Sequence, residues 1–221
     1  MELLFINLKN MFMMKKFFVL MAAMVMTMAA NAQDAVGTVS LKPMVGMTIA
    51  NVVGDDVEDS KMKVGLVAGA DLIYQVSDRF ALSGGLLYAM QGCKQDGVGD
   101  PKLKLDYLNV PLLGNLYVAK GLALKAGLQL GFLMSAKASA SDSGMSANVD
   151  VKDAFNTFDL SIPVGISYDI NNSFVIEGRY NFGMTKIMKK SGSLWGEGFE
   201  AESNDVRNSV IQLTLGYKFA L

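Results

Sequence analysis

Eight stretches of this chain alternate apolar and polar residues, and the connections between them are alternately long and short. In the clearest stretch, Phe158 to Ile170, every second residue is apolar and the residues between are polar or small. Strand side chains point to alternate faces, so this pattern predicts strands with one apolar and one polar face. We place the strands at 38–50, 62–76, 79–91, 105–119, 122–136, 156–170, 174–188 and 207–221. The rhythm of the connections is typical of an up-and-down antiparallel sheet that closes into a barrel.

The connections differ in chemistry as well as in length. The short ones carry turn-forming residues: Ser77-Asp78, Lys120-Gly121 and Asn171-Asn172-Ser173. The long ones cover 51–61, 92–104, 137–155 and 189–206. The third is rich in Ser and Ala, which predicts a mobile surface loop and not a linker. We therefore expect one barrel domain over residues 33–221.

Glycine decides which face of the barrel points outward. The polar face carries many glycines: Gly46, Gly65, Gly69, Gly85, Gly127, Gly131, Gly165, Gly183 and Gly216. A water-soluble barrel that carries lipid, of the lipocalin type, would instead show Lys, Glu and Thr on that face. Because a narrow lumen needs small residues and a solvated surface does not, the glycine face is predicted to point inward. The apolar face then meets lipid.

Aromatic residues support a transmembrane barrel. On the apolar face they gather near the short turns (Tyr74, Phe80, Tyr168, Phe174, Tyr217 and Phe219) and towards the long loops (Tyr88, Phe132, Phe158 and Phe182). Phe158 and Tyr168 are separated by roughly 33 Å along the strand and about 25 Å along the membrane normal after tilting. This separation matches two aromatic girdles around an apolar band.

Three prolines lie inside predicted strands: Pro43, Pro111 and Pro163. Each removes a hydrogen-bond donor, and a closed barrel has no free edge where the loss is harmless. We therefore expect local bulges or bends at these positions.

The start of the chain has the features of a secretory signal. Lys15 and Lys16 precede an apolar run, and Ala30-Asn31-Ala32 offers small residues at the cleavage positions. We predict a signal peptide over residues 1–32, cleaved before Gln33, because the run is too short for a membrane anchor. Residues 1–13 form an extra leader, and Met13 or Met14 is an alternative translation start.

The mature chain is mildly acidic. Removing residues 1–32 leaves 17 basic and 20 acidic residues, a net charge near −3. This balance argues against nucleic acid as a partner. The lone Cys93 excludes an internal disulfide, and we interpret it as an incidental thiol.

Tyr107-Leu108-Asn109-Val110-Pro111-Leu112-Leu113 resembles the aromatic-Leu-x-Ile/Val-Pro-Leu-Leu segment of the PorT-like outer-membrane β-barrel family of Bacteroidetes. The ending Gly216-Tyr217-Lys218-Phe219 is similar to the last strand of that family. The resemblance implies an eight-stranded barrel in the outer membrane of a Gram-negative cell, with periplasmic termini. For the founding members it also implies assistance to a protein secretion system. The x position is often acidic in the family but is Asn109 here, so no charge role is carried over.

Catalysis is not expected. Barrel enzymes generally use a histidine as general base, and this chain contains none. No paired carboxylate motif replaces it, and no motif indicates a cofactor or a metal site. The acidic first loop (Asp55, Asp56, Glu58 and Asp59) lacks the residue order of a known calcium loop and is interpreted as a solvated tip.

Charged and amide residues on the inward face are the main candidate site. They are Lys42, Lys63, Asp71, Lys125, Asp159, Glu177, Arg179 and Lys218, with Asn109, Asn115, Gln129 and Gln212. Buried charges must be paired, and eight strands leave an interior about wide enough for side chains alone. We therefore predict a polar network that plugs the lumen, built chiefly on Lys42, Asp71, Lys125, Asp159, Glu177 and Arg179; the alternative is a narrow ion path.

In a plugged barrel the surface loops are where function is expected. Trp195 and Phe199 in the last loop are the candidate contact residues for a protein partner, because aromatic residues are enriched at interfaces. The sequence thus predicts a monomeric, non-catalytic membrane protein that contacts lipid and binds a partner in the envelope. The alternative function is a narrow pore for ions or small solutes.

Overall fold

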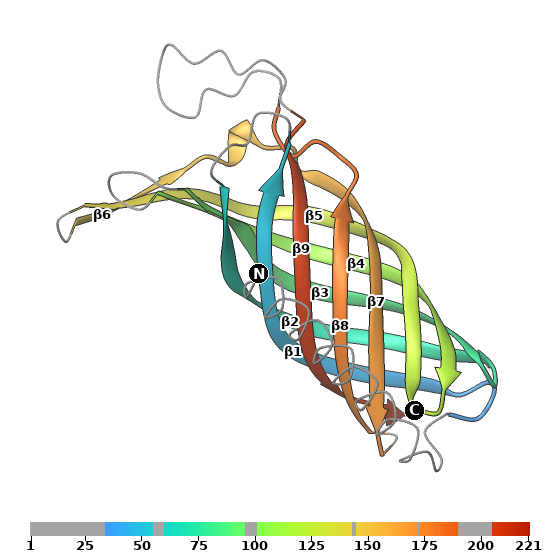
Figure 1. Ribbon diagram of the computed structural model, residues 1–221. Helices are drawn as coiled ribbons and strands as arrows, with labels where there is room; N and C mark the ends of the chain where they lie inside the picture. Colours follow the sequence, from blue (N-terminus) through green and yellow to red (C-terminus); the bar gives the residue numbers. More distant parts are fainter. Residues whose placement is uncertain (1–33, 55–59, 96–100, 143–144, 172, 190–204) are drawn as a thin grey trace, which may run out of the picture.

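The computed structural model describes residues 34–54, 60–95, 101–142, 145–171, 173–189 and 205–221, and most of them lie in one antiparallel sheet (Figure 1). Its strands are β1 (Val39–Val53), β2 (Ser60–Ser77), β3 (Phe80–Gln95), β4 (Lys102–Ala119), β5 (Leu122–Asp142), β6 (Met145–Asp150), β7 (Phe158–Ile170), β8 (Phe174–Gly183), β9 (Arg207–Tyr217) and β10 (Phe219–Ala220). The predicted signal peptide, residues 1–32, lies outside the described residues.

The sheet closes on itself. Each barrel strand pairs with the next, and β1 pairs with β9 from Met44 opposite Gly216 to Val53 opposite Arg207. β10 continues the line of β9 after Lys218, and β6 pairs only with β5. The barrel wall therefore has eight strands, and the predicted antiparallel up-and-down barrel is confirmed.

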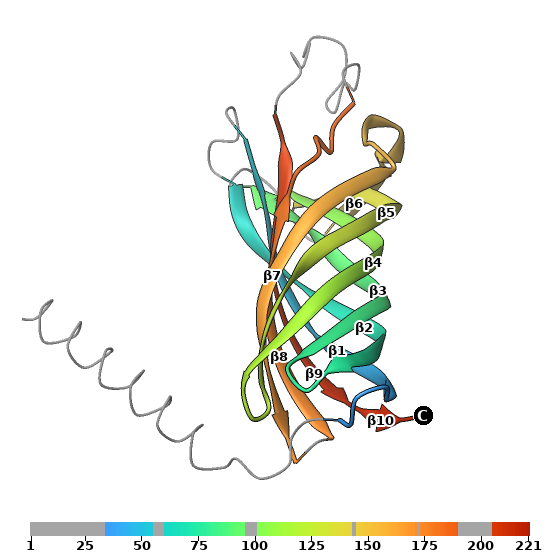
Figure 2. The same cartoon turned by 90° about the vertical axis from the view of Figure 1, so that its right-hand side faces the viewer.

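The two ends of the barrel differ. The turn end carries the three short connections, where Gly121 and Asn171 adopt left-handed φ values of 73° and 50°. Both ends of the described chain also lie there, because the Leu221 N–H donates to the Val39 carbonyl at 2.8 Å. The loop end is the other end, where β1, β3 and β8 end and β2, β4, β7 and β9 begin (Figure 2). Left-handed backbone at Gly and Asn is the turn chemistry that the sequence predicted.

The predicted loop 137–155 is wrong over most of its length. Residues 137–142 continue β5 and pair with β6, from Lys137 opposite Asp150 onward. This β5–β6 extension, residues 137–142 and 145–150, projects beyond the barrel wall (Figure 1). Ser and Ala have a low strand propensity, but here the backbone hydrogen bonds between β5 and β6 outweigh it. A 3₁₀ turn, η1 (Lys152–Ala154), follows, and no described helix is long and apolar enough to cross a membrane.

The sequence predicted bulges or bends at the prolines, and the bulges are not formed. At Pro43, Pro111 and Pro163 the register does not shift; instead, two residue pairs drop out of the ladder on one side, for example between Ala126–Val164 and Gln129–Ser161. On its other side, each of these strands stays paired with its neighbour at the proline. A proline removes only one donor, so the cost is local and no extra residue is needed. The register shifts of β4 occur elsewhere, at Asp106/Tyr107 and Tyr117/Ala119.

Side chains alternate between lumen and outer surface as predicted. Large apolar residues such as Leu66, Leu86 and Leu128 are exposed on the outside. Aromatic residues pair on that surface near both ends, with ring centroids 4.9 Å apart for Phe174 and Tyr217 at the turn end. At the loop end Phe132 and Phe158 are 5.9 Å apart. Aromatic contacts therefore lie on the outer surface near both ends of the barrel.

Gly85 illustrates why the inward face is rich in glycine. It lies opposite Asp71 in the β2–β3 ladder, and a Cβ at this position would overlap the Asp71 carboxylate. The missing side chain leaves room for a buried charge in a narrow interior.

Candidate functional site in the barrel lumen

Five charged side chains meet in the lumen towards the turn end. We name Lys42, Asp71, Lys125, Glu177 and Arg179 the central cluster. Lys42 Nζ lies 2.8 Å from Glu177 Oε2 and 3.1 Å from Asp71 Oδ2. Lys125 Nζ lies 2.6 Å from Glu177 Oε2, and Arg179 Nε donates to Glu177 Oε1 at 2.9 Å. Glu177 is therefore the centre of the cluster, with three cations around it.

The cluster is buried and unbalanced in charge. Each of its five side chains is at most 5% exposed. They come from β1, β2, β5 and β8, and strand alternation points all of them inward. Three cations face two carboxylates, and Arg179 Nη2 is 3.9 Å from Asp71 Oδ2. Buried charges are tolerated only when they are paired in this way.

A second ionic contact lies nearer the turn end. Lys218, in the break between β9 and β10, places Nζ 2.8 Å from Asp169 Oδ2 and 3.2 Å from Asp34 Oδ2. Ser40 donates to the same Asp34 oxygen at 2.9 Å. This contact joins residues at both ends of the described chain to β7.

Asp159 does not join the central cluster, although the sequence placed it in one network. It lies towards the loop end, where Thr185 Oγ1 donates to Oδ1 at 2.6 Å and Asn208 Nδ2 donates to Oδ2 at 2.9 Å. Its carboxylate is held by neutral donors and not by a cation. The remaining inward residues of the prediction are buried in the lumen, except Lys63, which is half-buried and donates to the Gln91 carbonyl at 2.6 Å.

An apolar cluster that the sequence did not predict fills the lumen at the loop end. We name it the apolar cap, and its buried members are Val52, Leu105, Tyr107, Leu133, Ala136, Phe155, Ile187 and Val206. Val52 on β1 and Leu133 on β5 come from distant parts of the barrel wall, so the cap spans the interior. The charged central cluster thus lies towards the turn end, and the largest apolar cluster among the described residues lies at the loop end.

Two segments outside the barrel strands complete the cap. Phe155, after η1, forms an isolated bridge with Met188. The Asn156 N–H donates to the Ile187 carbonyl at 2.8 Å, and the Ile187 N–H donates to the Val206 carbonyl at 2.9 Å. Backbone hydrogen bonds therefore hold Phe155 and Ile187 over the lumen. The predicted strand 174–188 is too long for this reason, since the chain leaves the ladder after Gly183 and folds inward.

An exposed ion pair lies next to the apolar cap and connects the two segments that carry Ile187 and Val206. Lys186 forms an ion pair and hydrogen bond with Asp205, and Arg207 Nη2 lies 3.8 Å from the other Asp205 oxygen. The hydrogen bond from Lys186 lowers the pKa of the Asp205 carboxyl. The carboxylate therefore stays charged over the neutral and mildly acidic range.

A signal for the apolar cap was present in the sequence. On the inward face of β4 the residues change from Asn109 and Asn115 to Leu105 and Tyr107 towards the loop end, and on β5 Leu133 has the same parity as Gln129. Phe155 lies outside the predicted strands and had no such signal, whereas Ile187 lies in the predicted strand 174–188 with the same parity as Glu177 and Arg179. Trp195, Phe199 and the acidic residues 55–59 lie outside the described residues.

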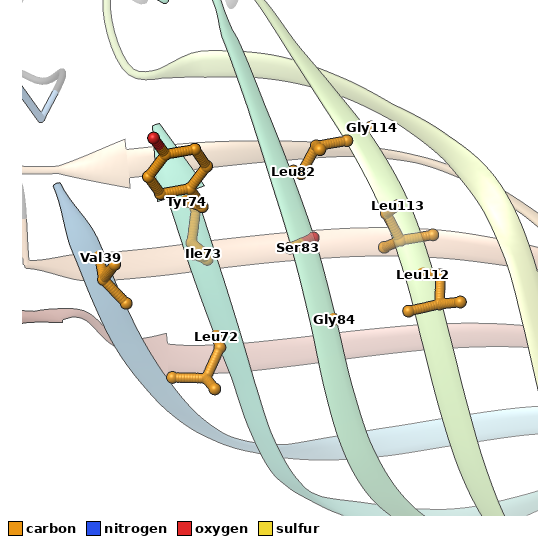
Figure 3. Close-up of a pocket in the computed structure, with 10 residues that line it drawn as sticks. All are labelled: Val39, Leu72, Ile73, Tyr74, Leu82, Ser83, Gly84, Leu112, Leu113 and Gly114. Carbon is orange, nitrogen blue, oxygen red and sulfur yellow. The ribbon is translucent and has the colours of Figure 1, made fainter. Parts of the chain in front are cut away.

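Figure 3 shows a shallow hollow on the outer surface. It forms where the outward-facing Gly84 on β3 and Gly114 on β4 leave space between larger neighbours. Its outer rim is apolar: Val39, Leu72, Tyr74, Leu82 and Leu112. Among the described residues no group of three or more His, Cys, Asp or Glu is placed to hold a metal ion.

A closed eight-stranded barrel with an apolar exterior and a charged lumen defines a β-barrel of the outer membrane. The sequence agrees: the profile of the outer membrane protein beta-barrel domain family matches residues 31–189, and the chain belongs to that family. No curated protein sequence matches this chain.

Solved structures of outer-membrane proteins have similar folds. Neisserial surface protein A (NspA), from Neisseria, is 12% identical, with 81% of this chain and 97% of that chain covered and a TM-score of 0.50. Ail, the attachment invasion locus protein of Yersinia pestis, solved with the heparin analogue sucrose octasulfate, is 18% identical over 84% of this chain and 100% of that chain, with a TM-score of 0.49. OprG from Pseudomonas aeruginosa is 14% identical, with 86% of this chain and 100% of that chain covered and a TM-score of 0.46. At these identities the NspA match shows the fold alone.

Proposed function

We propose that this protein is a non-catalytic outer-membrane barrel that acts through its surfaces, by stabilising the envelope or by binding a protein partner. The observation that carries the proposal is the double occlusion of the lumen. The central cluster fills it towards the turn end, and the apolar cap fills it at the loop end. An interior packed in this way offers no open route, so contacts with other molecules fall to the loops, the turns and the lipid-facing wall.

The β5–β6 extension is the largest described element outside the barrel wall and supports a partner-binding role. Val149 on β6 is 59% exposed, and β6 has a neighbour on one side only among the described residues. An unpaired strand edge is a surface on which another chain can add a strand. We place the partner contact at the loop end, in this extension or in the last loop with Trp195 and Phe199.

The PorT-like resemblance, with its Bacteroidetes setting, supports a narrower form of this proposal, in which the partner belongs to a protein secretion system. In that form the signal peptide is cleaved before Gln33, the turn end faces the periplasm, and the barrel is a monomer in the outer membrane.

Photo-crosslinking in cells tests the proposal. A crosslinking amino acid at Val149 is expected to capture a protein, while the matched control at Leu128, an outward-facing residue of the wall that is 51% exposed, captures only lipid. Secretion components captured at Val149 would support the narrower form. Lipid alone at Val149, and at positions 195 and 199, would overturn partner binding at the loop end.

A narrow pore is the second candidate function, and the polar lining of the lumen favours it. Gln129, Asn109 and Asn181 line the interior between the central cluster and the apolar cap. If the cap opens, this layer would be a hydrated path. Current recordings separate the two functions, because a surface-binding barrel does not conduct.

A further inference from the structure

Lysines gather on the outer face of the sheet at the loop end. They lie on four neighbouring strands, β2 to β5, and we name them the lysine patch: Lys61, Lys94, Lys102, Lys104 and Lys137. Lys94 lies directly opposite both Lys61 and Lys102. Two residues further along β4, Lys104 lies directly opposite Lys137. Directly opposite residues on a sheet have Cβ atoms about 5 Å apart, so the ladder holds these lysines next to one another in two rows.

The lysine patch faces away from the lumen. The residues that alternate with its lysines on β3, β4 and β5 belong to the apolar cap or pack against it: Cys93, Leu103, Leu105 and Ala136. Because successive side chains of a strand point to opposite faces, the lysines of these strands point outward. Lys61 shares this face, since it lies opposite Lys94. Four of the five side chains are exposed, and Lys102 is partly exposed.

The patch lies just beyond the aromatic residues of the outer surface. Leu108 on β4 is directly opposite Tyr88 and Phe132, two exposed aromatic residues towards the loop end. Lys104 is four residues further along β4, which is about 13 Å along the strand and about 10 Å along the membrane normal after tilting. Aromatic residues on a transmembrane barrel mark the boundary between hydrocarbon and headgroups. The long, flexible side chain of Lys104 therefore reaches the headgroup layer.

The described protein supplies little negative charge to the patch. Like charges that lie directly opposite each other on a sheet are destabilising. Two carboxylates are near, Asp106 two residues from Lys104 and Asp150 opposite Lys137. Within the described ranges neither forms an ion pair with a patch lysine of β3, β4 or β5. Elsewhere at the loop end the arrangement differs, because the exposed cations of residues 186 and 207 share the Asp205 carboxylate.

We propose that the lysine patch binds the phosphate groups of lipids whose headgroups carry a net negative charge. Lysine is a common phosphate-binding residue, and cations at a membrane surface attract anionic headgroups. The two rows hold the phosphate at a fixed place on the wall, while the acyl chains lie along the apolar face below. This site goes beyond the proposed function, and it stands whether or not the loop end binds a protein.

Native mass spectrometry of the purified barrel in a neutral detergent tests the site. The barrel is mixed with equal amounts of phosphatidylglycerol and phosphatidylcholine that have the same acyl chains. Phosphatidylglycerol adducts are expected to exceed phosphatidylcholine adducts, and the excess should shrink between about 0.05 M and about 0.5 M salt, because salt screens exposed charges. Equal binding of the two lipids would overturn the proposal. That result is expected if the acidic residues 55–59, which lie outside the described residues, neutralise the lysines instead.

Paired variants assign the preference to the patch. Lys104→Gln/Lys137→Gln removes one directly opposed pair and is expected to reduce the preference for phosphatidylglycerol at least about tenfold. Lys104→Arg/Lys137→Arg keeps both charges and should keep the preference. The control Arg79→Gln/Lys120→Gln removes the same charge from exposed positions at the turn end and should also keep it. A preference that survives in the first variant, or that is lost equally in the control, would contradict the site.

Inorganic phosphate distinguishes a lipid site from a site for free phosphate. Added at the concentration of phosphatidylglycerol, it should leave the lipid adducts in place, because the lipid also contacts the apolar wall through its acyl chains. Displacement of the lipid, with phosphate retained on the barrel, would overturn the assignment to a lipid headgroup.

Discussion

Lys42 Nζ and Glu177 Oε2 lie 2.8 Å apart although the two residues are separated by 135 positions in the chain. Lys42 is on β1 and Glu177 is on β8, and β9 lies between these strands. The barrel closes where β9 pairs with β1, so this contact reaches across the closing seam. It can therefore form only when the first and last strands have met, which couples the ionic chemistry of the lumen to barrel closure.

Glu177→Gln is expected to destabilise the barrel severely. The substitution leaves Lys42, Lys125 and Arg179 with only Asp71 as a counter-charge, and removing one partner of a buried ion pair typically costs about 3–5 kcal/mol. Urea unfolding in vesicles measures the change. The control Asp153→Asn removes an exposed carboxylate and should shift stability by no more than about 0.5 kcal/mol. Equal effects of the two substitutions would contradict the role of Glu177.

A pair of glycine substitutions tests the packing of the lumen. In Gly85→Ala the new methyl group overlaps the Asp71 carboxylate, so we expect a loss of about 1–3 kcal/mol. In Gly178→Ala, on the outer face, the nearest atom to the new methyl is Leu213 Cδ2 at 3.5 Å, an ordinary contact. This variant should unfold at nearly the wild-type urea concentration. A tolerated Gly85→Ala would mean that the lumen has room to spare.

Phe155→Ala is expected to loosen the apolar cap. Phe155 is 1% exposed, and deleting a buried Phe side chain typically costs about 3–5 kcal/mol. The Ile187 amide, which donates to the Val206 carbonyl, should then exchange with deuterium at least tenfold faster. Val149→Ala on the β5–β6 extension is the control and should leave that amide unchanged. An unaltered exchange rate in Phe155→Ala would show that the cap is held by other contacts.

The Asp205 contact predicts a dependence on pH. Because the folded-state pKa of Asp205 is lowered, its contribution is present above the unfolded-state pKa of about 3.9 and is lost as pH falls through the lower folded-state value. The Ile187 amide should thus be better protected in the wild type than in Asp205→Asn at pH 7 and at pH 5. The difference should disappear only in strong acid. Loss of the difference near pH 6 would contradict the ion pair.

The barrel could be predicted from sequence because the alternation of residues is repeated in every strand. The range predicted as 156–170 is β7, Phe158–Ile170, and the range 122–136 lies within β5. Parity also placed the members of the central cluster on one inward face, since each strand side chain has only two directions available. Which of them would touch was not predictable, because contacts across the lumen depend on strand order and stagger.

The apolar cap was missed for a physical reason. Phe155 and Ile187 belong to segments that leave the strand ladder, so strand parity does not show that these segments fold over the lumen. The bulges predicted at the prolines are absent because the chain accommodates the missing donor with a short gap in one ladder and needs no extra residue. β6 was missed because its Ser- and Ala-rich partner segment has low strand propensity.

Single-channel recording of the purified wild-type barrel in a planar bilayer tests the central claim, that the lumen is closed, most directly. The account predicts no stepwise current at any applied voltage, because the central cluster and the apolar cap block the interior in series. Stepwise currents that change when Glu177 and Arg179 are neutralised would place an ion path through the cluster and contradict the claim.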